Sequence, residues 1–203
     1  MRLLQLPAGL VCLALLGAAT VCAGEEPGDS GASNRVTRRS EANFTLPAVT
    51  LVRDDGKRVS LPAELDDGRP VALNFIYTNC TTICPLSSQI FSQFQDRLRG
   101  QKVKVHLVSI SIDPEQDTPA RLRDYAKQYG AQPGWDHYTG AFSVINDVQL
   151  AFHAYRGDKM SHTPLTFLRE APGKPWVRID GFATVDELLA ESHAWTAPAL
   201  VSR

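Results

Sequence analysis

Two apolar runs that flank an amphipathic segment constrain the fold of this chain most strongly. Residues 70–78 (PVALNFIYT) are apolar on both faces of an extended chain, which is typical of a central strand. Residues 103–112 form a second, nearly continuous apolar run. Between them an apolar residue recurs every four positions, which predicts a helix that Gly100 closes. Strand, helix and strand in this order predict two parallel strands with a right-handed crossover. The recurring residues are Leu86, Ile90, Phe94 and Leu98.

The remaining patterns add a hairpin before these strands and mixed elements after them. Two strands separated by a Pro-Gly-Lys-Pro turn are expected to pair antiparallel. The sequence therefore predicts an α/β protein, with a mixed central sheet flanked by helices and an extra N-terminal hairpin. The segments are a hairpin at 49–60, a helix capped by Thr118 and ended by Gly130, a short strand near 137, a helix spanning Phe142 to Phe152, strands at 165–168 and 176–179, and a last helix opened by a capping box at 184–187.

The first 23 residues predict export from the cytoplasm. Arg2 precedes an apolar stretch that ends in Val21-Cys22-Ala23, which is typical of a signal peptide cut after Ala23. The stretch is also long enough to be an uncleaved membrane anchor, so membrane association through residues 1–23 stays an alternative. Both interpretations place the body at the periplasmic or extracytoplasmic face of the membrane.

Composition divides the rest of the chain and excludes one class of partner. Residues 24–42 have almost no large apolar side chains, so we expect a flexible linker, a folded domain at 43–197 and a tail at 198–203. The formal net charge is −1, which gives no basic surplus to neutralise phosphates. Nucleic acid is therefore not an expected partner.

Cys80 and Cys84 are the only cysteines outside the export segment. They lie in CTTICP, where the predicted central strand ends and a helix starts, a common place for a site in open α/β sheets. Pro85 suits the first helical position, which makes Cys84 the expected N-cap, with its thiolate favoured by the helix N-terminus. The spacing suits a disulfide or two thiolates on one metal ion, so dithiol redox chemistry and metal binding both remain open. A small structural disulfide is the third interpretation, although so short a loop gains little from closure.

His162 is the candidate for a third ligand. It lies in MSHTP just before the predicted strand at 165–168, and this strand order can bring its loop next to the end of the central strand. The other histidines are interpreted as surface or packed side chains, with His137 ambiguous in its short strand. These are His106, His137, His153 and His193.

Four stretches together resemble the Sco/SenC family of thioredoxin-like copper proteins. The C-x-x-x-C-P motif and the S-x-D-P-E-x-D-T-P segment in combination are specific, and the resemblance runs from about Phe44 to the final helix. The stretches are 74–85 (NFIYTNCTTICP), 109–119 (SISIDPEQDTP), 135–140 (WDHYTG) and His162 ahead of residues 167–168.

The resemblance implies a thioredoxin-like fold and copper, Cu(I) or Cu(II), held by Cys80, Cys84 and His162. Soft thiolates select Cu(I), and an imidazole also accommodates Cu(II). It further implies a metallochaperone that delivers copper to, or adjusts the cysteine redox state of, the dinuclear copper site of cytochrome c oxidase subunit II. Another copper chaperone is the alternative partner.

Two departures from the family pattern favour a second function. Ser161 stands where the family commonly has an acidic residue before the histidine, and Thr163-Pro164 resembles the cis-proline turn of plain thioredoxins. The alternative is therefore a general thiol–disulfide oxidoreductase that uses Cys80 and Cys84 as its redox pair. A structural zinc module and a peroxidase based on Cys80 are more distant alternatives.

Overall fold

The structure is a computed structural model that describes residues 37–101, 104–193 and 195. These residues lie in one unit of the chain, residues 35–203. The predicted export segment at 1–23, most of the predicted linker and the predicted tail at 198–203 lie outside the described residues. Among the helices that the structure describes, none combines the length and hydropathy needed to cross a membrane.

Eight strands form one mixed sheet in the order β1-β8-β7-β4-β5-β6-β2-β3. β4, β5 and β6 run parallel, and every other pair of neighbours is antiparallel. The sheet confirms the predicted mixed α/β architecture with its added hairpin. The strands are β1 (Arg38–Ala42), β2 (Thr50–Arg53), β3 (Arg58–Ser60), β4 (Val71–Ile76), β5 (His106–Ser111), β6 (Trp135–Thr139), β7 (Leu165–Arg169) and β8 (Trp176–Asp180).

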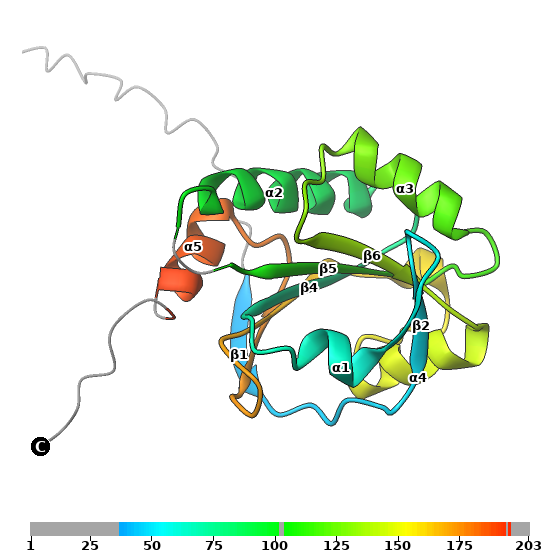
Figure 1. The fold of residues 1–203 in the computed structure, drawn as a ribbon, viewed down its shortest axis with the longest axis horizontal. Helices are drawn as coiled ribbons and strands as arrows, with labels where there is room; N and C mark the ends of the chain where they lie inside the picture. Colours follow the sequence, from blue (N-terminus) through cyan, green and yellow to red (C-terminus); the bar gives the residue numbers. More distant parts are fainter. Residues whose placement is uncertain (1–36, 102–103, 194, 196–203) are drawn as a thin grey trace, which may run out of the picture. The chain divides into compact units, whose positions relative to one another are not determined.

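The helices cover both faces of the sheet. Figure 1 shows α2 and α3 on one face and α1 and α4 on the other, and α5 contacts α2. The short α1 was not predicted from the sequence. The helices are α1 (Leu61–Leu65), α2 (Ile83–Leu98), α3 (Pro119–Gln128), α4 (Phe142–Ala151), the 3-10 turn η1 (Lys159–Ser161) and α5 (Val185–His193).

β4 and β5 are the buried centre of the sheet, as their apolar sequences predict. All six residues of each strand are buried. Their register pairs Val71 with His106 and Ile76 with Ser111, so their carboxyl ends reach the same edge. The loop that carries the cysteines leaves from this edge.

The capping predictions at two helix starts are confirmed. The Thr118 hydroxyl accepts from the N–H of Arg121, and Pro119 occupies the first turn of α3. At α5, the hydroxyl of Thr184 accepts from the N–H of Glu187, whose carboxylate accepts from the N–H of Thr184.

The predicted linker at 24–42 is wrong at its C-terminal end. Residues 38–42 form β1, which pairs antiparallel with β8. The strand gains its backbone hydrogen bonds from a sheet edge, together with an ion pair from Arg39 to Glu191 and a hydrogen bond from Thr37 to Glu187. Polar side chains therefore do not prevent this segment from being ordered.

Candidate metal and dithiol site

The two cysteines lie together where β4 leads into α2, with Cys80 in the connecting loop and Cys84 in the first turn of the helix. The N–H of Cys80 donates to the carbonyl of Tyr77 at 3.2 Å, which turns the chain directly after β4. The N–H of Cys84 then donates to the Sγ of Cys80 at 3.3 Å. Both thiols are free and buried, with exposed fractions of 5% and 1%. The motif therefore brings two reduced sulfurs to the edge of the sheet.

The expected role of Cys84 as N-cap is wrong. α2 begins at Ile83 with Thr82 as its N-cap, so Cys84 is already helical. The helix starts two residues before Pro85, which stays within the first turn, where a proline is tolerated. As a result, the sulfur that accepts from the helix N-terminus is Cys80 and not Cys84.

Because Cys80 rather than Cys84 accepts from the helix N-terminus, the two thiols have different pKa values. Burial alone would raise the pKa of Cys80, but hydrogen bonds from the Cys84 thiol, the Cys84 N–H and Thr82 outweigh it and lower that pKa to about 7. Burial raises the pKa of Cys84 well above its ordinary value, and the neighbouring Cys80 sulfur raises it further. Cys80 is therefore the thiol of the pair that ionises more readily near neutral pH, and the better nucleophile.

His162 lies beside the strand that leads into the cysteine loop. It follows η1 and precedes β7, which pairs with β4, as the strand order predicted. Its Nε2 is 3.0 Å from the carbonyl oxygen of Phe75 in β4. Because a carbonyl only accepts, Nε2 carries the proton and Nδ1 keeps its lone pair. Burial lowers the pKa of His162, which favours the neutral ring, and the backbone carbonyl orients it in place of the acidic neighbour that Ser161 does not provide.

The three predicted ligands do not form a closed metal site among the described residues. Within residues 37–101 and 104–193, only Glu64, His106 and Asp136 bring three such ligand atoms within 4.8 Å of one another. The ligand atoms of Cys80, Cys84 and His162 do not all lie within that distance of one another. Binding of one ion by all three residues therefore requires side-chain movement.

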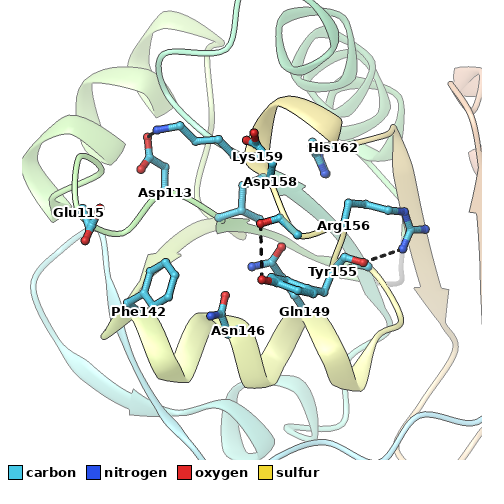
Figure 2. Close-up of a pocket in the computed structure, with 13 residues that line it drawn as sticks. Asp113, Glu115, Phe142, Asn146, Gln149, Tyr155, Arg156, Asp158, Lys159 and His162 are labelled. Carbon is cyan, nitrogen blue, oxygen red and sulfur yellow. Dashed lines mark hydrogen bonds and ion pairs between the residues drawn. The ribbon is translucent and has the colours of Figure 1, made fainter.

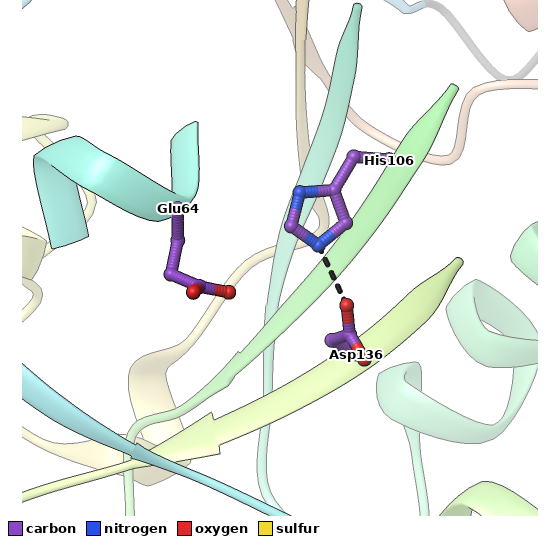
Figure 3. Close-up of side chains that lie close together, drawn as sticks. All are labelled: Glu64, His106 and Asp136. Atoms are coloured by element: carbon purple, nitrogen blue, oxygen red, sulfur yellow. Dashed lines mark hydrogen bonds and ion pairs between the residues drawn. The ribbon is translucent and has the colours of Figure 1, made fainter. Parts of the chain in front are cut away.

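The Glu64, His106 and Asp136 cluster is separate from the cysteines. His106 opens β5, at the end opposite the cysteine loop, and its Nε2 lies 2.9 Å from Asp136 (Figure 3). Glu64 accepts from the Tyr138 hydroxyl at 2.7 Å and faces Arg53 at 3.6 Å. The carboxylates are thus already occupied by donors from the protein, which is typical of a structural polar network.

A cavity of about 360 Å³ opens beside His162, between α4 and η1 (Figure 2). Its wall includes the Lys159 ammonium, which pairs with the buried Asp113 carboxylate at 2.6 Å. This ion pair connects the segment after β5 to the turn that precedes His162. The side chain of Phe142 is 57% exposed at the rim.

Sequence reasoning missed Asp117, which organises the cysteine loop. Its carboxylate is fully buried and accepts from the N–H and hydroxyl of Thr78, at 3.0 and 2.6 Å, and from the Ser111 hydroxyl at 2.6 Å. Asp117-Thr118-Pro119 is already explained as the start of a helix. The sequence therefore gives no signal that Asp117 also holds the cysteine loop. The carboxylate fixes the backbone two residues before Cys80.

Two further features concern the residues on either side of His162. The Tyr77 hydroxyl donates to the Sδ of Met160 at 3.7 Å, which connects the cysteine loop to η1. None of the peptide bonds between described residues is cis, so Thr163-Pro164 does not share the cis geometry of the thioredoxin turn that it resembles.

Comparison with known proteins agrees with this fold. The family model described as SCO1/SenC matches residues 37–197. A SCO1 protein homolog of Bacillus subtilis is 36% identical over 99 residues, which cover 48% of this chain and 50% of that protein. A SCO2-like protein of Rickettsia conorii is 32% identical over 110 residues, covering 49% of this chain and 53% of the relative. The chain thus spans about half the length of these relatives.

Solved structures extend the similarity across most of the described domain. BsSco, described as a member of the Sco family of cytochrome c oxidase assembly proteins with a disulfide switch, matches with a TM-score of 0.66 and 28% identity, over 77% of this chain and 96% of that chain. Arabidopsis thaliana ScoI with copper bound matches with a TM-score of 0.61 and 29% identity, over 72% and 94% of the two chains.

Proposed function

We propose, since this chain belongs to the SCO1/SenC family, that it is an extracytoplasmic copper metallochaperone whose ligands are Cys80, Cys84 and His162. The observation that carries the proposal is the pair of free thiols at the edge of β4, beside a histidine that contacts the same strand. The similarity to Sco proteins with copper bound supports copper as the cargo.

The donor set fits copper in both oxidation states. Two thiolates prefer Cu(I), and the neutral imidazole of His162 suits Cu(II). Cys80 ionises more readily than Cys84, so it is the first ligand to bind, and Cys84 releases its proton when copper arrives. The Nε2–H of His162 stays on the carbonyl of Phe75, so Nδ1 is the atom available to copper.

The proposed recipient is the dinuclear copper site of cytochrome c oxidase subunit II, with another copper chaperone as the alternative partner. Cu(I) passes by ligand exchange: a thiolate of the recipient binds copper as one protein thiolate leaves and takes up a proton, and the second exchange completes transfer. Copper stays Cu(I) throughout, so no electron acceptor is needed. The predicted export segment at 1–23 supports a location at the periplasmic or extracytoplasmic face.

Anaerobic titration of the reduced protein with Cu(I) against a competing chelator tests the proposal. We expect one tightly bound equivalent, lost in the Cys80→Ser, Cys84→Ser double variant. His162→Ala should weaken Cu(II) binding, whereas the exposed His153→Asn should not. Asn is the matched control because His153 has a φ of 51°, which asparagine tolerates. Absence of tight stoichiometric binding, or binding that survives loss of both cysteines, contradicts the proposal.

The difference between the pKa values of Cys80 and Cys84 also favours the second function, thiol–disulfide exchange. The Cys80 thiolate attacks a substrate disulfide and releases one substrate thiol. Cys84, after losing its proton, then attacks Cys80, frees the second thiol and leaves the protein oxidised. Cys84→Ser should therefore trap a mixed disulfide and Cys80→Ser should not. His162→Ala separates the two functions, because it should affect copper binding and leave this exchange intact.

A further inference from the structure

We propose that Met160 supplies a thioether ligand to Cu(I) bound at Cys80 and Cys84. This inference rests on the proposed copper function and adds a residue that the motif of two cysteines and a histidine does not contain. It is drawn from the position of the Met160 sulfur beside the cysteine loop.

Tyr77 brings the thioether and the cysteine loop together. Its hydroxyl donates to the Met160 Sδ at 3.7 Å, although the two residues are 83 positions apart. Tyr77 is also joined to the cysteine turn, because its carbonyl accepts from the N–H of Cys80 at 3.2 Å. Tyr77 therefore links the Met160 sulfur to the turn that carries Cys80.

The backbone of Met160 is fixed while its side chain is free to move. Its N–H donates to the Asp158 carboxylate at 2.8 Å, and the adjacent Lys159 pairs with Asp113 at 2.6 Å. The residue itself is 74% exposed, the highest value among the large exposed hydrophobic residues of the described chain. An unbranched side chain with three rotatable bonds can turn its sulfur toward Cys80 without moving the backbone.

Thioether chemistry suits Cu(I) and a chaperone in particular. A thioether is soft and neutral, so it favours Cu(I) over Cu(II) or Zn²⁺ and has no proton to release. The imidazole of His162, held by Phe75, is the better ligand for Cu(II). As a weaker and more exposed ligand than either thiolate, Met160 is also the one that a recipient's thiolate displaces first.

Methyl NMR of the full chain tests the inference directly, because the sequence contains only two methionines, Met1 and Met160. With ¹³C-methyl methionine, Met160→Leu assigns the resonance. We expect one equivalent of Cu(I) to shift the Met160 methyl signal and leave Met1 unmoved. We also expect Met160→Leu to weaken Cu(I) binding by about tenfold while Cu(II) binding stays within about twofold, as the softness of the ligand requires.

A transplanted thioether provides the matched control. Leu150, on α4, is 55% exposed, so Met160→Leu combined with Leu150→Met keeps a solvent-exposed thioether away from Tyr77. Its methyl signal should not respond to Cu(I), and its Cu(I) affinity should match that of Met160→Leu alone.

The outcomes separate this inference from the proposed function. If thiolate-to-copper absorption develops while the Met160 signal and the affinity of Met160→Leu are unchanged, the thioether ligand is wrong and the copper site stands. If no variant with intact cysteines takes up Cu(I), both are wrong.

Discussion

The backbone N–H of Cys84 donates a hydrogen bond to the sulfur of Cys80 across 3.3 Å. This contact reverses the roles expected from the motif, because the helix N-terminus stabilises the first cysteine and the second is enclosed in the core. The pair thus consists of one thiol that ionises near neutral pH and one that stays protonated, an arrangement suited to metal capture and to dithiol exchange alike.

The two thiols should titrate in well-separated steps. In Cys84→Ser, where serine can still donate to Cys80, ultraviolet thiolate absorbance should rise through a midpoint near pH 7. In Cys80→Ser, no thiolate should form until far more alkaline pH, because burial raises the pKa of Cys84. The double variant gives the tyrosine background. A lower midpoint for Cys84 than for Cys80 would show that the assignment is reversed.

Loss of the Asp117 carboxylate should loosen the cysteine loop. Asn in its place offers one acceptor oxygen to the three donors on Thr78 and Ser111 and directs its own N–H groups toward them. Asp117→Asn should reduce the free energy of unfolding in urea by about 1–3 kcal/mol. Amide exchange at Thr78 should also become faster.

Asp124→Asn is the control, because this carboxylate on α3 is 78% exposed and faces only Lys127. It should leave both measurements unchanged. Equal effects of the two substitutions would mean that Asp117 does not hold the loop.

Acid should destabilise the protein partly through His137. This ring is fully buried, neither nitrogen has a hydrogen-bond partner, and burial lowers its pKa from 6.5 to about 4. Between these values the unfolded state binds a proton that the folded state does not, so stability falls as pH drops from 6.5 toward 4. The largest slope from one such group is roughly 1.4 kcal/mol per pH unit.

Replacing His137 by an apolar residue of similar size should remove its contribution to the pH dependence of the unfolding free energy. His137→Leu should flatten the dependence of unfolding free energy on pH in that range, whereas His153→Asn should not. The nearest carboxylate, Asp54, is 4.0 Å from Nδ1 of His137 and does not satisfy it. An unchanged slope in His137→Leu would assign the acid sensitivity to other groups.

The central part of the fold could be predicted because burial leaves a clear pattern in sequence. β4 and β5 are continuous apolar runs, and the caps at Thr118 and Thr184 are local chemistry. β1 could not be predicted, since residues 38–42 are stabilised by backbone pairing to an edge and by distant side chains. Neither kind of contact leaves an apolar signature in the segment itself.

The same distinction between local sequence patterns and tertiary contacts applies to the site. The motif predicted that Cys80 and Cys84 lie together where the central strand leads into a helix, and the strand order predicted that His162 lies near the end of that strand. The start of α2 two residues before Pro85, the contacts of Asp117 and the approach of Met160 to Tyr77 all depend on tertiary packing. A helix tolerates proline at several positions of its first turn, so Pro85 alone does not fix the residue at which α2 begins.

The coordination of Cu(II) in the loaded full chain tests the account most directly, because it asks whether Cys80, Cys84 and His162 reach one ion. X-ray absorption at the copper edge should show two sulfur scatterers and one imidazole nitrogen. The imidazole signal should disappear in His162→Ala and persist in His153→Asn. A copper shell without sulfur, or an imidazole signal that survives His162→Ala, would contradict the account.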